Sequence, residues 1–175
     1  MLRATALSGF GVAKPKIAKV TWSETLATNF NLIEYRSHRN LASSLAFGGT
    51  EVRVRFQSSD TEALSVDNAS IGIRTGSASD TVSTPVELLF SGGSGFDIGT
   101  SEQITSDWVA LTTTTSDVLV VVIDFAAVNG GIRFSSTSGD DTYYRTSYDS
   151  YNLASVTGFA LASANTICSN QIEVR

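Results

Sequence analysis

The amino-acid sequence predicts an all-β protein: an antiparallel β-sandwich with jelly-roll or Greek-key topology and an extended N-terminal arm. The first observation is the segment 116–125, where an uninterrupted aliphatic run rich in valine lies between two aspartates. Such a run is typical of a strand buried on both faces, as at the centre of a sandwich. The second is a series of about ten short strand-like segments separated by turn residues. The third is composition, because Ser, Thr and Gly are abundant and no segment has the pattern of a covering helix.

Length and charge favour one domain with an arm. The chain has 175 residues, of which 42% are hydrophobic, and this is enough for one well-buried core. Residues 1–55 hold eight of the twelve Lys and Arg residues against three acidic residues, whereas the remainder is acidic. We therefore divide the chain into an extended arm at residues 1–30 and a single β-sandwich domain at residues 31–175.

All three lysines lie in this arm, at Lys14, Lys16 and Lys19, and Trp22 follows them. A basic arm on an acidic body favours contact with an acidic surface on a neighbouring subunit, although a solvated segment explains the charge equally well. These four residues are the candidate assembly contacts. The net charge of −5 argues against binding of nucleic acid by the whole surface.

The strands are expected in the following order. Glycines and Pro15 favour an extended arm or one edge strand around 17–22, and the capping pattern at Thr21–Glu24 also allows one helical turn up to Phe30. Segment 51–56 alternates strictly, which places Val52, Val54 and Phe56 on the core face and three charged residues on the other. Further strands are expected at 64–66, 69–74, 86–90, 103–111 with a break near 106–107, 132–135, 143–145, 156–161 and 170–174.

Several expectations concern what the chain lacks. A single cysteine, Cys168, excludes an internal disulfide and a cysteine-based metal cluster, and we expect it to be buried. We expect no metal and no cofactor; Asp140 and Asp141 are interpreted as turn residues, with calcium ligation as the alternative. His38, the one histidine, is expected at the surface or hydrogen-bonded. Without a secretory signal or a membrane-spanning run, we expect a soluble protein with no membrane or nucleic-acid partner.

Five segments taken in order resemble a known accessory domain. They are 52–56 (Val-Arg-Val-Arg-Phe), 62–66 (Glu-Ala-Leu-Ser-Val), 69–74 (Ala-Ser-Ile-Gly-Ile-Arg), 105–111 (Thr-Ser-Asp-Trp-Val-Ala-Leu) and 116–122 (Ser-Asp-Val-Leu-Val-Val-Val). Together they resemble the β-sandwich domain beside the catalytic domain of bacterial SGNH, or GDSL-type, esterases, with Trp108 where that pattern usually has proline. The resemblance implies a jelly-roll fold like that of a carbohydrate-binding module.

The catalytic motifs of those esterases have no counterpart in this sequence. The nearest string to Gly-Asp-Ser is 139–142, Gly-Asp-Asp-Thr, and Tyr35 stands three residues before His38, where the second motif has Asp. We therefore expect a protein that is not an enzyme. Its acidic body, basic arm and polar loops also resemble the small β modules that tailed bacteriophages carry as decoration, spike or fibre proteins.

Four of the five tyrosines lie within nine residues. Aromatic rings suit sugar faces and protein interfaces alike. The candidate glycan-binding or partner-binding site therefore comprises Tyr143, Tyr144, Tyr148, Tyr151, Asp140 and Arg145. The alternative is that alternate tyrosines pack within a strand.

The sequence thus predicts a non-enzymatic structural or attachment protein, a bacteriophage virion surface component that is assembled in the host cytoplasm. It is expected to dock through its N-terminal arm as a capsid decoration, spike or tail protein. Its expected partners are neighbouring copies and the capsid or tail, with cell-surface polysaccharide as a further candidate. The alternative is a carbohydrate-binding accessory module related to SGNH esterases, and a divergent hydrolase is the third hypothesis.

Overall fold

The computed structural model describes residues 15–32, 37–76, 78–126, 129–135, 140–146, 150–155, 157–162 and 166–175. Within these residues every regular element is a β-strand and every strand pairing is antiparallel. The all-β antiparallel sandwich predicted from the sequence is confirmed, whereas its jelly-roll or Greek-key connectivity stays a prediction.

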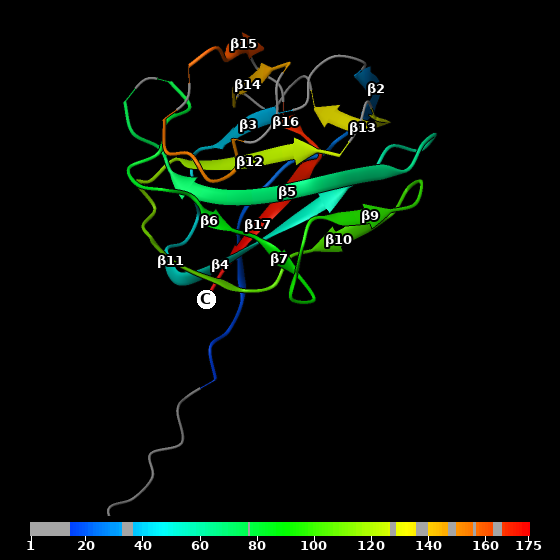
Figure 1. Cartoon of the computed structure of the whole chain (residues 1–175). Coiled ribbons are helices and arrows are strands. Elements are labelled where there is room, and N and C mark those ends of the chain that lie inside the picture. The colour runs from blue at the N-terminus through cyan, green and yellow to red at the C-terminus, as the bar shows by residue number, and fades with distance from the viewer. Residues whose placement is uncertain are drawn as a thin grey trace, which may run out of the picture.

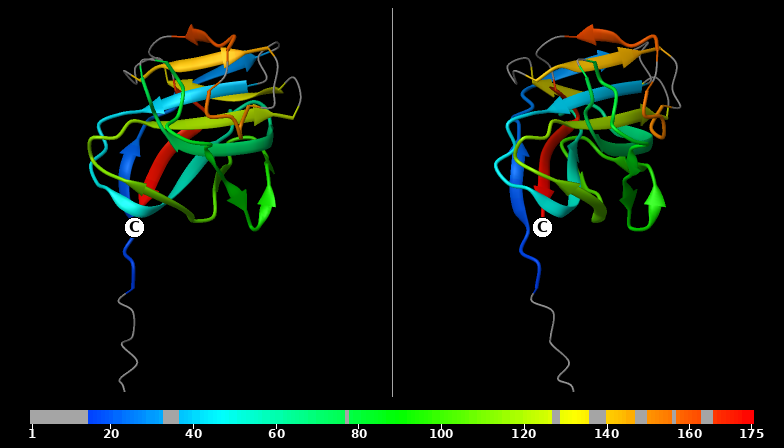
Figure 2. Two further views of the ribbon diagram at one scale, coloured as in Figure 1. Left: turned by 60° about the vertical axis from the view of Figure 1, so that its left-hand side comes forward. Right: turned by 90° about the vertical axis from the view of Figure 1, so that its left-hand side faces the viewer.

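Two sheets form the layers of the sandwich (Figures 1 and 2). The five-stranded sheet has the order β1-β17-β4-β10, and β11 also pairs with β4. Its strands are β1 (Lys19–Ser23), β4 (Gly49–Gln57), β10 (Gln103–Thr105), β11 (Val109–Thr113) and β17 (Ser169–Val174). The seven-stranded sheet has the order β15-β14-β3-β12-β5-β6, and β9 pairs with β5. Its strands are β3 (Ser37–Ala42), β5 (Leu64–Ile73), β6 (Val86–Glu87), β9 (Phe96–Ile98), β12 (Leu119–Phe125), β14 (Thr142–Arg145) and β15 (Ala160–Ala162).

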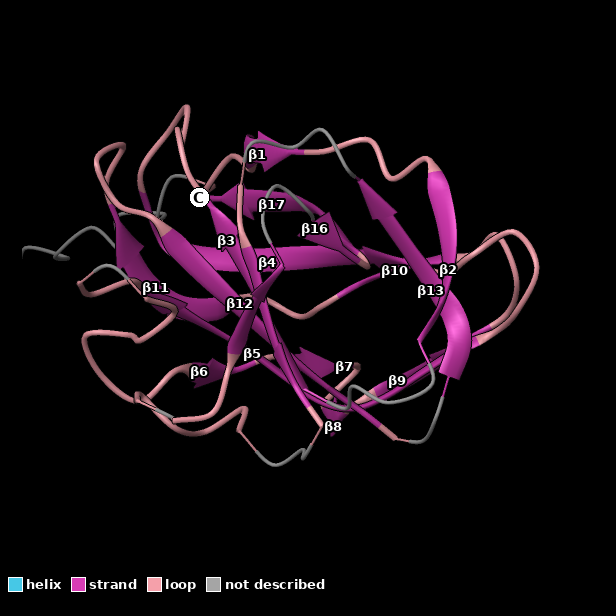
Figure 3. Cartoon of the chain, turned by 90° about the horizontal axis from the view of Figure 1, so that it is seen from above, coloured by secondary structure: helices cyan, strands magenta, loops and turns pink. Residues whose placement is uncertain are grey.

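Five short strands complete the molecule. A three-stranded sheet of β16 (Thr166–Ile167), β13 (Asn129–Ser135) and β2 (Thr28–Leu32) lies at one end, and β7 (Leu89–Phe90) pairs with β8 (Gly93–Ser94). Seen from above, β4 of one layer crosses β5 and β12 of the other (Figure 3). No helix that could span a membrane occurs in the described part of the chain.

The hydrophobic core lies between the two sheets. Val52, Val54 and Phe56 on β4 are fully buried, and the charged residues between them face outward, as the alternation predicts. Strand β12 is buried along its whole length between β3 and β5, so the prediction of a central strand is confirmed. On the side of β12 away from the core, Val120 and Val122 pack with Leu41 in a second group, here called the outer cluster.

The predicted break in segment 103–111 is also present. Strands β10 and β11 both pair with β4, and Ser106 lies between them. The Ser106 N–H donates to the carbonyl oxygen of Val54, and its hydroxyl accepts from the Val54 N–H. One buried serine therefore keeps β4 fully hydrogen-bonded where its partner strand is interrupted.

The boundary expected at residue 30 is wrong. Strand β1 pairs with β17, β2 pairs with β13, and Trp22 is only 7% exposed within the core. The edge strand expected around 17–22 is confirmed as β1. The expected helical turn at 21–30 is wrong, because strand pairing satisfies the backbone there. Residues 15–18 are exposed and outside any strand, and residues 1–14 lie outside the described residues. Among the described residues, the first strand of the body therefore begins at Lys19.

Candidate functional site

The described tyrosines of the predicted site do not share one surface. Tyr143 and Tyr144 are neighbours on β14, and the pleat of a strand directs neighbouring side chains to opposite faces. Tyr143 packs against the outer cluster, as does Tyr151, whereas the ring of Tyr144 lies 6.3 Å from that of His38. Tyr148 lies outside the described residues. The binding role of this segment stays a prediction, and Tyr143 and Tyr151 have the packing role of the alternative interpretation.

Two buried charged residues hold the loop 150–154 over the outer cluster. The guanidinium of Arg39 donates to the carbonyl oxygens of Ser79, Ser150, Leu153 and Ala154. The carboxylate of Asp124 accepts hydrogen bonds from the Ser37 hydroxyl and from the N–H groups of Ser150 and Tyr151. Burial lowers the pKa of Arg39, while the charges of Asp80 and Asp124 act in the opposite direction. These contacts make Arg39 and Asp124 structural residues.

Arg145, from the predicted site, contacts the same aromatic ring as Arg39. Its guanidinium carbon is 5.4 Å from the ring centroid of Phe159, and that of Arg39 is 5.2 Å from the same ring. Both distances are within the range of a cation–π contact. Arg145 therefore contributes to packing at the edge of β14.

Ser37, His38 and Asp124 do not combine into a hydrolase triad. Ser37 bonds to Asp124 on the outer side of the sheet, whereas the ring of His38 lies 5.4 Å from that of Phe125 on the core side. Because consecutive strand residues point to opposite faces, the hydroxyl and the imidazole are separated by the sheet itself.

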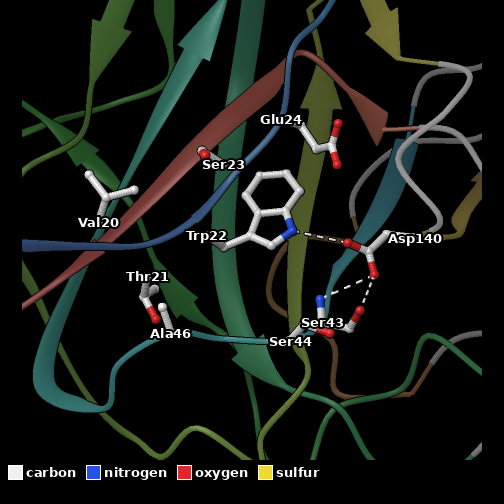
Figure 4. A pocket seen from close by; sticks show the side chains of 9 residues that line it. All are labelled: Val20, Thr21, Trp22, Ser23, Glu24, Ser43, Ser44, Ala46 and Asp140. Carbon is white, nitrogen blue, oxygen red and sulfur yellow. Dashed lines mark hydrogen bonds between the residues drawn. The ribbon is translucent and has the colours of Figure 1, made fainter.

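Two residues that the sequence placed in different sites meet in one pocket (Figure 4). The indole N–H of Trp22 donates to Asp140 Oδ2 at 3.0 Å, and the other oxygen of Asp140 accepts from the N–H and hydroxyl of Ser43. The pocket has a volume of about 360 Å³ and is lined by Val20, Thr21, Trp22, Ser23, Glu24, Ser43, Ser44, Ala46 and Asp140. Asp140 itself is only 7% exposed. Through its hydrogen bonds to Trp22 and Ser43, its carboxylate connects β1 with the segment before β4 and the segment before β14.

The lysines of the predicted arm contact the body where the structure describes them. Lys16 Nζ forms an ion pair of 2.6 Å with Glu51, and hydrogen bonds from Lys16 and Arg175 lower the pKa of that carboxyl group. Lys19 Nζ lies 4.8 Å from the ring centroid of Phe47. Lys14 lies outside the described residues. Trp22 belongs to the core, so its assignment as an arm contact is wrong.

The outer face of the five-stranded sheet carries a group of residues that the sequence analysis did not combine into one site. Trp108 precedes β11, and its ring centroid lies 4.6 Å from the guanidinium carbon of Arg53 and 4.4 Å from that of Arg175. Arg53 pairs with Glu173 at 2.6 Å, and Arg175 pairs with Glu51 at 2.9 Å. Trp108 therefore reaches across β4 to the end of β17.

Part of this face could be found in the sequence and part could not. The alternation of 51–56 already places Arg53 and Arg55 on the solvent face of a strand. The position of Trp108 depends on the pairing of β11 and β17 with opposite edges of β4. Local sequence patterns do not predict this pairing.

No protein family matches this sequence, and no curated protein matches it. The resemblance to the SGNH accessory domain therefore stays a prediction from strand patterns. Among the residues that the structure describes, no group of three or more His, Cys, Asp or Glu side chains is placed to hold a metal ion.

Proposed function

We propose that this protein is a non-enzymatic attachment protein that docks on a larger assembly, the surface of a bacteriophage virion, through its N-terminal segment. The observation that carries the proposal is the exposed segment 15–18, which continues from the edge strand β1 away from the body (Figures 1 and 2). Segment 15–18 leaves the body beside the end of β17, because Lys19, the first residue of β1, pairs with Val174.

The side chains around this segment combine exposed apolar groups with positive charge. Ile17 is 72% exposed, Val20 is 44% exposed, and Phe47 is 41% exposed beside Lys19. Single exposed apolar residues are normal on a protein surface, but three along one edge strand and its neighbouring segment favour a contact surface.

The buried carboxylates support a structural role for the body. Asp124 and Asp140 are each engaged by hydroxyl and N–H groups that join distant segments. A body held together in this way suits the rigid presentation of a surface on a particle.

Particle fractionation tests this function. The gene is expressed together with its neighbouring genes, the lysate is separated on a density gradient, and the fractions are probed for the protein. The full chain is expected to migrate with the particles, and a chain lacking residues 1–18 is expected to remain at the top of the gradient. This deletion keeps β1, whereas a deletion of 1–30 would remove β1, β2 and the core residue Trp22.

A matched pair of substitutions controls for general surface effects. Ile17→Asp is expected to release the protein from particles, whereas Val82→Asp is expected to leave it bound, because Val82 is 70% exposed but lies in the loop between β5 and β6. Absence of the full chain from the particle fraction would overturn the function, and equal binding of both variants would overturn the role of the segment.

A further inference from the structure

The outer face of the five-stranded sheet, here called the Trp108 face, has the chemistry of a binding surface. Its described cationic side chains are Lys16, Arg53, Arg55 and Arg175, and its carboxylates are Glu51 and Glu173. The excess of cations contrasts with the net charge of −5 of the whole chain. The face is therefore complementary to a negatively charged partner.

One cation of this face has no carboxylate of its own. Arg55 Nε donates to the amide oxygen of Asn170 at 3.2 Å, and within the described part of the chain no carboxylate lies within 4.0 Å of its guanidinium. Arg55 stands opposite Gln171 on β17 and Thr105 on β10, and directly opposite residues of antiparallel strands share a face. The Arg55 guanidinium thus lies among hydroxyl and amide groups. Its N–H donors lie in one plane, an arrangement that suits the two oxygens of a carboxylate.

Trp108 supplies an aromatic ring close to this cation. Its neighbour Arg53 lies two residues from Arg55 along β4, a separation of about 7 Å. One half-buried ring flanked by two arginines lacks the apolar centre that protein interfaces bury. Aromatic rings with hydrogen-bonding planar side chains suit the apolar faces and hydroxyl groups of sugars.

From these observations we infer that the Trp108 face binds a carboxylated polysaccharide. A sugar ring packs against the part of Trp108 that Arg53 and Arg175 leave exposed, and a neighbouring carboxylate forms a charge-assisted pair with Arg55. This inference rests on the proposed function, because it names what an attached copy holds through the Trp108 face. The docking segment and this face meet at Lys16, which pairs with Glu51. The site is separate from Tyr143 and Tyr144, which lie on β14 of the other sheet.

Titration calorimetry with polygalacturonate and with its methyl ester tests the inference, because the two polymers differ in the carboxylate. The full chain is expected to bind polygalacturonate more tightly, with an affinity that falls between about 20 mM and 200 mM salt. Arg55→Gln is expected to weaken polygalacturonate binding about 10-fold and to leave methyl-ester binding unchanged. Arg55→Lys is expected to retain most of the affinity, because it keeps the charge. Trp108→Ala is expected to weaken both ligands.

Control variants separate the two candidate glycan sites. Arg145→Gln and Tyr144→Phe, on β14, are expected to bind like the unmodified chain. Thermal unfolding of each variant shows that any loss of binding is not loss of fold. Absence of polygalacturonate binding, equal binding by Arg55→Gln, or loss only in the β14 variants would overturn the inference. A chain that elutes as a dimer, and that Arg55→Gln converts to a monomer, would identify the face as a contact between copies instead.

The test is independent of particle attachment. Arg55→Gln and Trp108→Ala retain residues 1–18, so both are expected to migrate with particles if the proposed function holds. Particle binding without glycan binding would reject only the Trp108 face, and glycan binding without particle binding would reject only the docking segment.

Discussion

At the scale of single residues, Cys168 carries a pH dependence that can be measured. It is fully buried between β16 and β17 with a φ of 58°, and burial raises the pKa of its thiol to about 12, against a smaller lowering by the backbone of Arg133. An unfolded thiol has a pKa of about 8.5, so between these values the folded state keeps a proton that the unfolded state loses. Stability is therefore complete below about pH 8.5 and falls as the pH rises towards 12.

The expected loss from this thiol is about 2 kcal/mol at about pH 10. It is measured as the decrease in the free energy of urea unfolding between about pH 7.5 and 10, compared with Cys168→Ala, which is expected to show a shallower decrease. Parallel pH profiles in the two proteins would contradict the prediction, since lysines and tyrosines also titrate in this range and are common to both.

Arg39 gives a second prediction at this scale. Arg39→Met removes donors from four backbone carbonyl groups and leaves Asp124 without its buried cationic neighbour. We expect a loss of about 3–5 kcal/mol in the free energy of unfolding. Arg39→Lys keeps the charge but lacks the two terminal guanidinium nitrogens that donate to the carbonyl oxygens of Ser79 and Leu153. It is therefore expected to recover only part of the lost stability. An Arg39→Met protein with near-normal stability would show that the loop 150–154 is held by other contacts.

At the scale of elements, the hydrogen bond between Trp22 and Asp140 ties the first strand of the body to the segment before β14. Trp22→Phe keeps an aromatic ring in the core but leaves the buried carboxylate one donor short, which costs about 1–3 kcal/mol. In a double-mutant cycle with Asp140→Asn, measured by urea unfolding, we expect a coupling free energy of about 1–2 kcal/mol. Additive effects of the two substitutions would mean that the contact does not stabilise the docking of β1.

Elements with a clear period were predictable, whereas the sheet position of an element without one was not. The alternation in 51–56 and the valine run of β12 are consequences of local burial, so the sequence shows them directly. The sequence predicts an edge strand around 17–22, where β1 lies, but the place of β1 in the sheet depends on pairing with β17, which is distant in sequence. For this reason the sequence alone predicts that Trp22 belongs to an arm, whereas the fold places it in the core.

At the scale of the whole molecule, the candidate sites depend on contacts that only the complete sandwich makes. The tyrosine segment looked like one site because its residues are close in sequence, but the pleat of β14 separates Tyr143 from Tyr144. The Trp108 face unites residues near positions 53, 108 and 175, and the pocket unites residues near 22, 43 and 140. Such groupings arise from sheet order, and sequence patterns do not report sheet order.

Because β17 pairs with both β1 and β4, the five-stranded sheet depends on strands that lie far apart in the sequence. We therefore expect one cooperative unfolding transition and folding within about milliseconds to seconds, the range of domains with non-local strand pairing. The two tryptophans test this, since Trp22 lies in the core and Trp108 on the outer face. In the single-tryptophan variants Trp22→Phe and Trp108→Phe, the fluorescence transition in urea is expected to coincide with that of far-ultraviolet circular dichroism. A Trp108 signal that changes before the Trp22 signal would show that the outer face loosens separately, so that the Trp108 face is not a rigid binding surface.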